Sequence, residues 1–195
     1  EELNLGGGFG VYYHGEDHPL DLQHCLKNLL EIVRNEAAHL DIKIPKLMIE
    51  PGRAIVANAG TTLYTVGAVK KTYGGKDYVF IDGGMTDNPR TALYDAKYDS
   101  VIANKLHLPR EQNYTVAGKC CESGDIIIKD IKLPRTERGD LLAVLSTGAY
   151  NYSMASNYNR IPRPPVVFVK DGQSKLAVRR ETFEDLLKND MDIDI

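Results

Sequence analysis

The sequence predicts an α/β segment over residues 1–58, followed by an all-β segment over residues 59–195 that ends in a short helix. Two observations support this division. Near the N-terminus, one amphipathic, helix-length stretch lies between two short apolar runs, which is the pattern of a strand–helix–strand unit. Near Gly60 the pattern changes, and the apolar runs become short and are separated by turn residues, as in β domains.

The strand–helix–strand unit begins with residues 3–5, an apolar strand that runs into a glycine cluster. Residues 22–40 then carry leucine, valine and alanine at helical spacing, with charged side chains on much of the other face. We expect this helix to start at the Asp-His-Pro sequence of residues 17–19. A second apolar strand follows at residues 47–49, and its continuous apolar character is typical of a buried parallel strand.

Both strands of this unit end in groups suited to an anion. Residues 6–8 are all glycine, which lets backbone N–H groups approach a phosphate closely. The second strand runs into Glu-Pro-Gly-Arg at residues 50–53, where Arg53 offers a planar charged fork. Either motif alone is also explained by a surface turn. Their occurrence at two neighbouring strand ends favours parallel strands that share a ligand at their carboxyl ends.

The all-β segment is a series of short apolar runs, each bounded by turn residues. The predicted strands span residues 61–69, 78–81, 114–117, 126–128, 141–145, 166–169 and 176–178. The last two flank Asp171 and Gly172, which is a hairpin signal. Thr182 with Asp185 predicts a capped start for the final short helix.

Bulk properties narrow the class of protein. The net charge of −3 argues against binding nucleic acid through the overall field. No apolar run is long enough to cross a membrane. Three cysteines do not make a disulfide framework and favour a reducing cytoplasm, and the five histidines show no zinc-binding spacing, so no metal is expected. Because the chain starts with Glu1 and enters a strand almost at once, we expect it to be a fragment.

Arg90 and Tyr94 form one candidate binding pair in the all-β segment. They are four residues apart, so on a helical turn they would share a face. An arginine can fork onto a carboxylate and a tyrosine can add a hydroxyl donor, which together suit an acidic ligand. The alternative is a solvated arginine that lies over an aromatic ring.

Two further candidates lie in loops that follow predicted strands. Cys121 and Glu122 come after residues 114–117; a cysteine can deliver a proton, and a glutamate can hold an ammonium group. The alternative is a small buried residue beside an exposed glutamate. Tyr150, in a hydroxyl-rich stretch after residues 141–145, either reaches a ligand or belongs to the core.

With these motifs in view, the chain resembles the fold-type III pyridoxal-phosphate decarboxylases, and most closely their branch that acts on diaminopimelate. Five ordered segments carry the resemblance across nearly the whole chain: residues 5–10, 50–53, 88–94, 121–125 and 148–150. The resemblance implies that residues 1–58 are the closing part of a pyridoxal-phosphate-binding (β/α)8 TIM barrel. Residues 59–195 would then form the family's C-terminal β-barrel or sandwich domain, with a short final helix.

The resemblance also implies roles for individual positions. Pyridoxal 5′-phosphate would be the cofactor, and Glu50 would pair with its pyridine nitrogen, which keeps the ring a good electron sink. The other cofactor contacts would come from Gly6, Gly7, Gly8, Pro51, Gly52, Arg53 and Tyr150. The substrate would be bound by Arg53, Arg90, Tyr94, Glu122 and Tyr150. Cys121 would return a proton to the α-carbon after decarboxylation, so Cys121 and Glu50 are the implied catalytic residues.

By the same resemblance, Cys121 and Glu122 would reach the active site of a partner subunit, so the enzyme would be a homodimer with shared sites. The implied reaction is decarboxylation of meso-2,6-diaminopimelate to L-lysine and carbon dioxide, a step of lysine biosynthesis. Arg90 with Glu122 complements the carboxylate and ammonium at the far end of that substrate. The lysine to which the family attaches its cofactor would lie on a barrel strand before Glu1. We therefore expect the chain to be inactive without the N-terminal half of its barrel.

Two other functions fit the same sequence. The first is an ornithine- or arginine-type decarboxylase of the same fold, whose substrate carries a bare distal ammonium. The second is a non-catalytic, regulatory relative that binds a partner. The joint presence of the residues with implied chemical roles argues against this second function: Glu50, Arg53, Arg90, Cys121, Glu122 and Tyr150.

Overall fold

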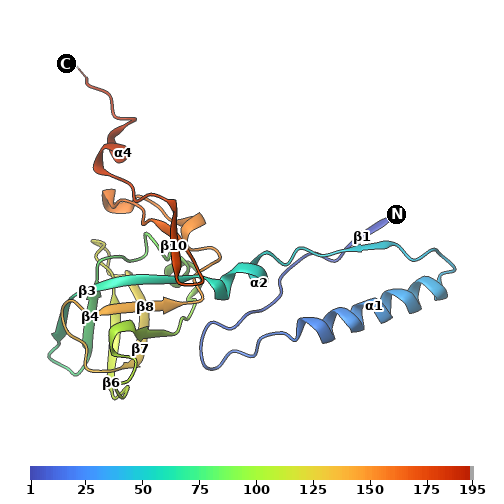
Figure 1. Ribbon diagram of the computed structural model, residues 1–195, viewed down its shortest axis with the longest axis horizontal. Helices are drawn as coiled ribbons and strands as arrows, with labels where there is room; N and C mark the ends of the chain where they lie inside the picture. Colours follow the sequence, from blue (N-terminus) through green and yellow to red (C-terminus); the bar gives the residue numbers. More distant parts are fainter. Residues whose placement is uncertain (194–195) are drawn as a thin grey trace.

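The computed structural model describes residues 1–193, and the chain forms three parts in sequence order (Figure 1). An elongated N-terminal unit projects from one side of a β barrel. A C-terminal arm that carries α4 extends from the top of the barrel in this view, whereas the N-terminal unit extends to the right. The parts follow the expected order of an α/β segment before an all-β segment.

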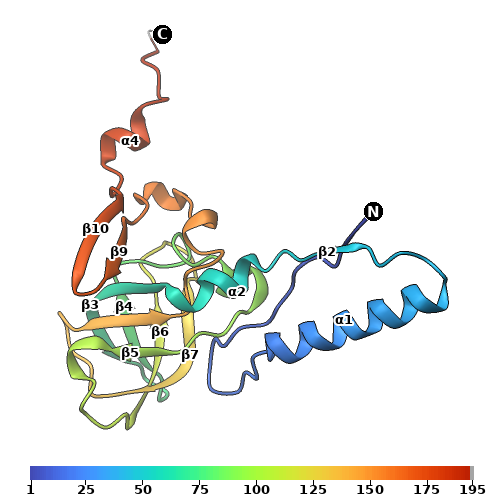
Figure 2. The same ribbon diagram turned by 45° about the vertical axis from the view of Figure 1, so that its right-hand side comes forward.

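The N-terminal unit consists of strand β1 (Glu2–Asn4), helix α1 (Leu22–His39) and strand β2 (Lys46–Met48). The two strands are parallel neighbours, as predicted, with Leu3 opposite Leu47. Helix α1 runs along one side of this strand pair (Figure 2). Within the described part of the chain, no helix combines the length and apolar character needed to cross a bilayer.

Helix α1 begins later than the sequence predicted. Its N-cap is Asp21, whose carboxylate accepts the backbone N–H of His24 at 3.0 Å. The expected start at residues 17–19 is wrong, because the carboxylate of Asp17 caps a different turn. It accepts the backbone N–H groups of Tyr13 and His14 at 2.8 and 2.9 Å. Aspartate favours both helix N-caps and turns, and the sequence pattern at residues 17–19 did not show which of these Asp17 forms.

Much of the apolar surface of the N-terminal unit is exposed. In residues 1–50 only Phe9 and Ala37 are buried hydrophobic residues. The exposed apolar side chains include Leu30, Ile32, Leu40, Ile42 and Ile44. Two parallel strands with one helix bury little on their own, because parallel sheets are normally covered on both faces.

Helix α2 (Gly52–Val56) and a 3-10 turn (Ala57–Ala59) connect the N-terminal unit to the barrel. Six strands then form one mixed sheet: β3 (Thr61–Lys71), β4 (Asp77–Ile81), β5 (Ser100–Ile102), β6 (Gln112–Ala117), β7 (Ile126–Leu133) and β8 (Leu141–Leu145). Their spatial order is β5-β8-β3-β4-β6-β7, and only β4 and β6 pair in parallel. Strands β5 and β7, at the two ends of this order, contact each other, so the sheet is a nearly closed barrel.

The hydrophobic core lies inside this barrel. It is built from inward-facing residues of every barrel strand, as expected for a half-buried antiparallel sheet. The most completely buried members are Val66, Val79, Ile102, Val116, Ile127, Leu133, Leu142 and Val144. This core holds the loops at the strand ends in place, and those loops carry Arg90, Tyr94, Cys121, Glu122 and Tyr150.

The C-terminal arm contains a hairpin and a short helix, as the sequence predicted. Strands β9 (Val166–Lys170) and β10 (Gln173–Val178) pair in an antiparallel manner, and both turn residues between them have positive φ. Helix α4 (Phe183–Leu187) starts with a capping box in which the side chain of Thr182 and that of Asp185 each accept a backbone N–H. The arm therefore confirms both local motifs.

Candidate active site

The carboxyl ends of β1 and β2 meet at the glycine cluster, as predicted. The backbone N–H of Glu50 donates to the carbonyl of Gly6 at 2.7 Å. Gly7 approaches so closely that a Cβ added there would overlap the carbonyl oxygen of Glu50. Only glycine fits this position, so the absence of side chains is what allows the two strand ends to touch.

Gly6 and Gly8 differ from Gly7 in that the space beside them is open. Both have positive φ, at 74° and 83°, and a Cβ on either would meet nothing within 4 Å. The backbone thus forms an open, curved surface, and Asn4 links it to the carboxylate of Glu50. Such a surface is suited to a phosphate group.

Asn4, at the end of β1, organises this surface and was not among the residues that the sequence singled out. Its Nδ2 donates to Oε1 of Glu50 at 2.5 Å, and its Oδ1 accepts the backbone N–H of Gly6 at 2.8 Å. One side chain therefore sets the position of both the glycine cluster and the Glu50 carboxylate. A polar residue at the end of an apolar strand, two residues before the glycines, was the available signal.

Arg53 lies in α2, directly after the second strand end. Its side chain is half-buried, and its Nε is buried without a hydrogen-bond partner among the described residues. A buried guanidinium N–H without an acceptor is costly, and an anion relieves that cost. The open glycine surface and the unpaired Nε together fit a phosphate-bearing cofactor.

Arg90, the first residue of helix α3 (Arg90–Tyr94), lies in a cage of tyrosines. Its guanidinium carbon is 4.9 Å from the ring centre of Tyr13, 5.8 Å from that of Tyr98 and 5.9 Å from that of Tyr150. The structure thus brings together two predicted site residues, Arg90 and Tyr150. It also bears out the expectation of an arginine over an aromatic ring, although this arginine is half-buried rather than freely solvated.

Tyr94 is the predicted partner of Arg90, and it points elsewhere. It ends the one-turn helix that Arg90 begins, and it is 64% exposed. The aromatic contacts of Arg90 are to rings from other parts of the chain. Tyr94 therefore remains available at the surface, and its role in substrate binding stays a prediction.

Tyr150 is fixed beside α2 by a close approach of two glycines. Gly60 and Gly148 pack so tightly that a Cβ on either would overlap backbone atoms, at Gly148 those of Val56. The N–H of Gly148 also donates to the carbonyl of Ala57 at 2.9 Å. Tyr150 itself has a φ of 63° and is 47% exposed, so it belongs to the surface of the site rather than to the core.

The loop between β6 and β7 distinguishes its two cysteines. Cys121 is exposed, and its N–H donates to Oδ1 of Asn159 at 2.7 Å. Cys120 is half-buried, and its backbone N–H donates to Oδ2 of Asp125 at 2.8 Å. Burial, reinforced by the neighbouring Asp125 carboxylate, raises the pKa of Cys120 to about 11. Both thiols are free; Cys120 is half-buried and Cys121 is exposed, so the alternative of a buried small residue at Cys121 is wrong.

Glu122 presents an exposed carboxylate next to Cys121. Its Oε1 accepts the backbone N–H of Gly124 at 3.1 Å and the hydroxyl of Ser123 at 3.3 Å. These hydrogen bonds lower the pKa of Glu122, so the carboxylate stays ionised. A fixed, ionised and exposed carboxylate is suited to hold an ammonium group.

Asp125 links the loop between β6 and β7 to the loop between β4 and α3, which ends at Arg90. Its buried carboxylate accepts the N–H of Met85 at 2.7 Å and that of Cys120 at 2.8 Å. Two glycines make room for it, because a Cβ on Gly84 or on Gly118 would overlap its oxygens. The sequence had placed Asp125 in a motif without a role of its own. Its burial and its reach across two loops depend on the tertiary structure.

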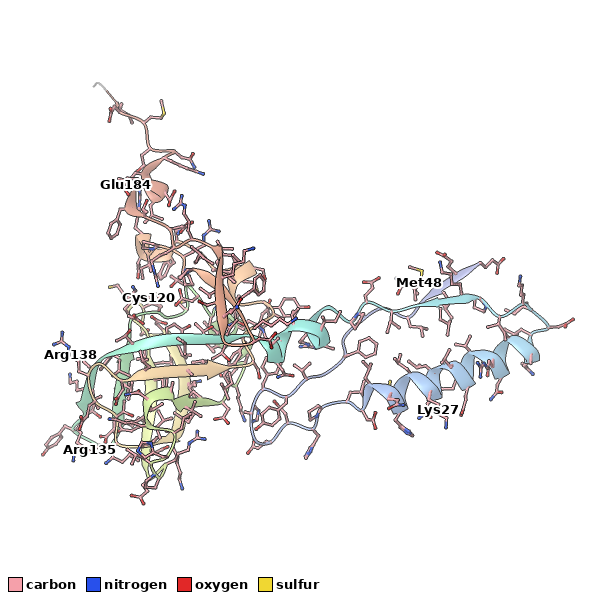
Figure 3. The ribbon with its side chains drawn as sticks, viewed as in Figure 1. Lys27, Met48, Cys120, Arg135, Arg138 and Glu184 are labelled. Atoms are coloured by element: carbon pink, nitrogen blue, oxygen red, sulfur yellow. The ribbon has the colours of Figure 1, made fainter. Side chains whose placement is uncertain are left out.

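The candidate residues do not all converge within one chain. Figure 3 shows Cys120 on the barrel and Met48, two residues before Glu50, on the N-terminal unit, well apart in that view. The glycine surface with Glu50 is therefore one group, and the loop that carries Cys121 and Glu122 is a separate exposed group. Across residues 1–193, no cluster of histidine, cysteine and acidic side chains is arranged to bind a metal ion.

Known proteins share the sequence and fold of this chain. A family model described as "Pyridoxal-dependent decarboxylase, C-terminal sheet domain" matches residues 11–148. Diaminopimelate decarboxylase of Bacillus subtilis is 53% identical over 189 residues, which are 97% of this chain and 43% of that protein. The chain thus spans less than half the length of the curated relatives that it matches.

Solved structures agree with this similarity. The crystal structure of diaminopimelate decarboxylase from M. jannaschii in complex with L-lysine matches with a TM-score of 0.87 at 34% identity, covering 99% of this chain and 43% of that one. The lysine/ornithine decarboxylase of Vibrio vulnificus, complexed with putrescine, matches with a TM-score of 0.66 at 29% identity, covering 83% of this chain and 42% of that one.

Proposed function

The chain belongs to the pyridoxal-dependent decarboxylases, whose C-terminal sheet domain it carries, and we propose that it is part of a diaminopimelate decarboxylase. That enzyme converts meso-2,6-diaminopimelate to L-lysine and carbon dioxide, in lysine biosynthesis. The observation that carries the proposal is the contact of Gly7 with Glu50, and the unpaired Nε of Arg53, three residues further along the chain, supports it. In this proposal residues 1–58 complete a (β/α)8 barrel and residues 59–195 form the β domain.

The cofactor of this reaction is pyridoxal 5′-phosphate, which supplies a ring that accepts the electron pair left when carbon dioxide departs. The backbone of Gly6–Gly8 and Gly52, with Arg53 and Tyr150, would hold its phosphate. Pro51 sets the turn that brings Gly52 and Arg53 to the strand end. Glu50, whose carboxylate is fixed by Asn4, would keep a proton on the ring nitrogen. A carboxylate at that position favours decarboxylation over racemisation.

The distal end of the substrate carries both a carboxylate and an ammonium group. Arg90 would bind the carboxylate, with Tyr94 adding a hydroxyl donor, and Glu122 would bind the ammonium. The half-buried position of Arg90 and the ionised state of Glu122 support these roles. Arg53 would also meet the carboxylate at the reacting end.

Cys121 would donate a proton to the α-carbon once carbon dioxide has left. Its exposed thiol supports this role, whereas burial and the carboxylate of Asp125 raise the pKa of the half-buried Cys120 thiol. Since Cys121 and Glu122 lie on a part of the chain separate from Glu50, we further propose that they complete the site of a partner subunit. The active enzyme is then a homodimer with shared sites, in the cytoplasm, where free thiols persist.

A lysine- or ornithine-type decarboxylase is the second candidate, because such an enzyme from Vibrio vulnificus shares the fold at 29% identity. A substrate of that type has a bare distal ammonium and leaves Arg90 without a carboxylate to bind. The caged position of Arg90 and the 53% identity to the Bacillus enzyme both favour diaminopimelate. A regulatory, non-catalytic role has no observation in its favour.

The proposal is tested with the full-length protein that contains this chain, incubated with meso-diaminopimelate and pyridoxal phosphate. L-Lysine and carbon dioxide in equal amounts are the expected products. Mixing inactive Cys121→Ala and Glu50→Ala subunits tests the shared site. Random mixing should restore about a quarter of wild-type activity, because each mixed dimer has one intact site. If no activity returns while mixed dimers form, the two residues act in the same subunit.

A further inference from the structure

The buried hydroxyl of Tyr98 accepts a hydrogen bond from Arg90. Nη1 of Arg90 donates to Oη of Tyr98 at 2.6 Å, and Oη of Tyr98 lies 3.4 Å from Oδ1 of Asn151. Tyr98 and Asn151 are each only 3% exposed. The half-buried guanidinium is therefore tied, through one tyrosine, to a residue that lies beside Tyr150 in sequence.

The direction of this hydrogen-bond chain is fixed by chemistry. A guanidinium can only donate, so Oη of Tyr98 must accept from Arg90 and must send its own proton elsewhere. Asn151 supplies the acceptor. Because burial raises the pKa of Tyr98, the hydroxyl keeps its proton throughout the neutral range. The protons therefore run in the order Arg90 to Tyr98 to Asn151.

The same tyrosine limits how the guanidinium can move. Tyr98 packs edge-on against Tyr13 with ring centres 5.4 Å apart, and Arg90 lies over both rings. Arginine has several rotatable bonds, and a free side chain would lose its freedom only when it bound a ligand. Here the cage and the hydrogen bond have already fixed the guanidinium in one direction.

We propose that Tyr98, held by Asn151, is the positioning residue that aims Arg90 at the distal carboxylate of the substrate. The pair thereby determines the preference for an amino acid at the far end over a bare amine. This inference rests on the proposed function, because it takes Arg90 as the group that meets the substrate. Tyr98 and Asn151 act through Arg90 and touch neither substrate nor cofactor.

The test compares two competitive inhibitors of the full-length enzyme that differ in a single carboxylate. L-Lysine retains the carboxylate that would face Arg90, and cadaverine lacks it. Tyr98→Phe keeps the aromatic cage and removes only the hydroxyl. We expect the inhibition constant of L-lysine to rise about tenfold, as when a hydrogen bond to a charged group is lost, with that of cadaverine unchanged.

A control variant separates positioning from general stability. Tyr114 is also a buried tyrosine of the barrel, and its hydroxyl donates to Gln112 and accepts the N–H of Thr136. Tyr114→Phe should therefore lower stability without changing the ratio of the two inhibition constants. If Tyr98→Phe does not fold, Asn151→Ala removes the other end of the hydrogen-bond chain. It is expected to raise the ratio of the inhibition constant of L-lysine to that of cadaverine, as Tyr98→Phe does.

Equal weakening of both inhibitors, or an unchanged ratio, overturns the inference. Release of L-lysine from meso-diaminopimelate by the wild-type enzyme tests the proposed function separately. If wild-type turnover is present and the ratio in the variants is unchanged, only the positioning role fails. If the wild-type enzyme does not turn over diaminopimelate, the proposed function fails, whatever the ratio.

Discussion

The backbone of Gly7 and the carbonyl oxygen of Glu50 are in direct contact, with no room between them for a side chain. This contact joins the carboxyl ends of β1 and β2. It also places the only carboxylate of the 50–53 motif next to an open glycine surface. The proposed cofactor site depends on this one approach of two strands.

Gly7→Ala is therefore expected to weaken binding of pyridoxal phosphate to the full-length enzyme. Relieving the overlap with Glu50 forces the two strand ends apart, and overpacking of this kind typically costs about 1–3 kcal/mol. If that cost falls on the cofactor-bound state, affinity drops by about 5- to 150-fold. Gly10→Ala is the matched control, because a Cβ at Gly10 meets nothing within 4 Å. Cofactor affinity is measured by absorbance titration. Equal affinities in the two variants would show that the contact is unimportant.

Gly118→Ala is expected to destabilise the enzyme by about 1–3 kcal/mol, because the new Cβ overlaps the buried carboxylate of Asp125. Asp125→Ala alone also destabilises, since it leaves two backbone N–H groups without their acceptor. The double variant should lose about 1 kcal/mol less stability than the sum of the losses in the two single variants. Gly124→Ala is the control, with its nearest neighbour at 3.6 Å. Thermal unfolding measures the stability of all four variants. If the losses in the two single variants simply add in the double variant, the new Cβ does not clash with Asp125.

The two adjacent cysteines should react with iodoacetamide at very different rates. With a pKa of about 11, only on the order of one Cys120 thiol in a thousand is ionised at pH 8, and only the thiolate reacts. Cys121 is exposed and should be labelled first. Peptide mapping of the wild type and of Cys121→Ala, in which Cys120 remains, measures both rates. Faster labelling of Cys120 than of Cys121 would contradict the description of Cys121 as the accessible thiol.

The same pair gives a prediction for turnover. Cys121→Ala in the full-length enzyme should lower kcat by at least about 10²-fold, since a positioned acid usually supplies that much. Cys120→Ala should be mild by comparison. If kcat of Cys121→Ala falls by less than about tenfold, Cys121 is not the proton donor.

The ion pair of Arg163 and Glu181 ties the segment before β9 to the residues before α4. Nε of Arg163 donates to Oε1 of Glu181 at 2.7 Å, and the backbone N–H of Arg163 donates to Oε2 at 2.8 Å. The hydrogen bonds from Arg163 lower the pKa of Glu181 to about 2. Since the folded state favours the ionised carboxylate, this contribution is complete above an unfolded pKa of about 4.3 and declines as the pH falls through about 2.

Glu181→Gln should therefore reduce local stability at pH 7, by an amount that shrinks toward pH 3. The side chain of Arg163 is 42% exposed, so solvent screening limits the effect to about 1 kcal/mol. Hydrogen exchange of the Arg163 amide in the full-length enzyme measures it. Glu16→Gln is the control, because Glu16 pairs with Lys97 at the open surface. An effect of Glu181→Gln that did not change with pH would exclude the ion pair as its cause.

Sequence patterns predicted the parts of this protein that local chemistry determines. The parallel pairing of β1 with β2, the β9–β10 hairpin at Asp171 and the capping box at Thr182 were all expected. Strand β5 was not, because its three residues are too few to show an alternating pattern. The start of α1 was misplaced by the proximity of two aspartates, Asp17 and Asp21, each able to cap a turn.

The candidate site also contains residues that the sequence indicated and residues that only the fold brings together. The glycine cluster, Glu50 and Arg53 could be found from the sequence, since each lies at the end of an apolar run. The residues that hold them could not: Asn4, Tyr98, Asp125 and Asn151. Tyr98 and Asn151 are 53 positions apart and meet only in the folded barrel. Their roles depend on burial and hydrogen-bond direction, which no local pattern records.

The central claim is that the full-length protein containing this chain recognises a substrate with an amino acid at both ends. The most direct test is the ratio of kcat/KM for meso-diaminopimelate to kcat/KM for L-ornithine, measured with saturating pyridoxal phosphate. We predict a ratio of at least about 10³, because a site built around a fixed arginine loses its partner when the distal carboxylate is absent. A ratio below one would contradict the assignment of Arg90 and Glu122, and would identify the enzyme as a decarboxylase of simple diamino acids.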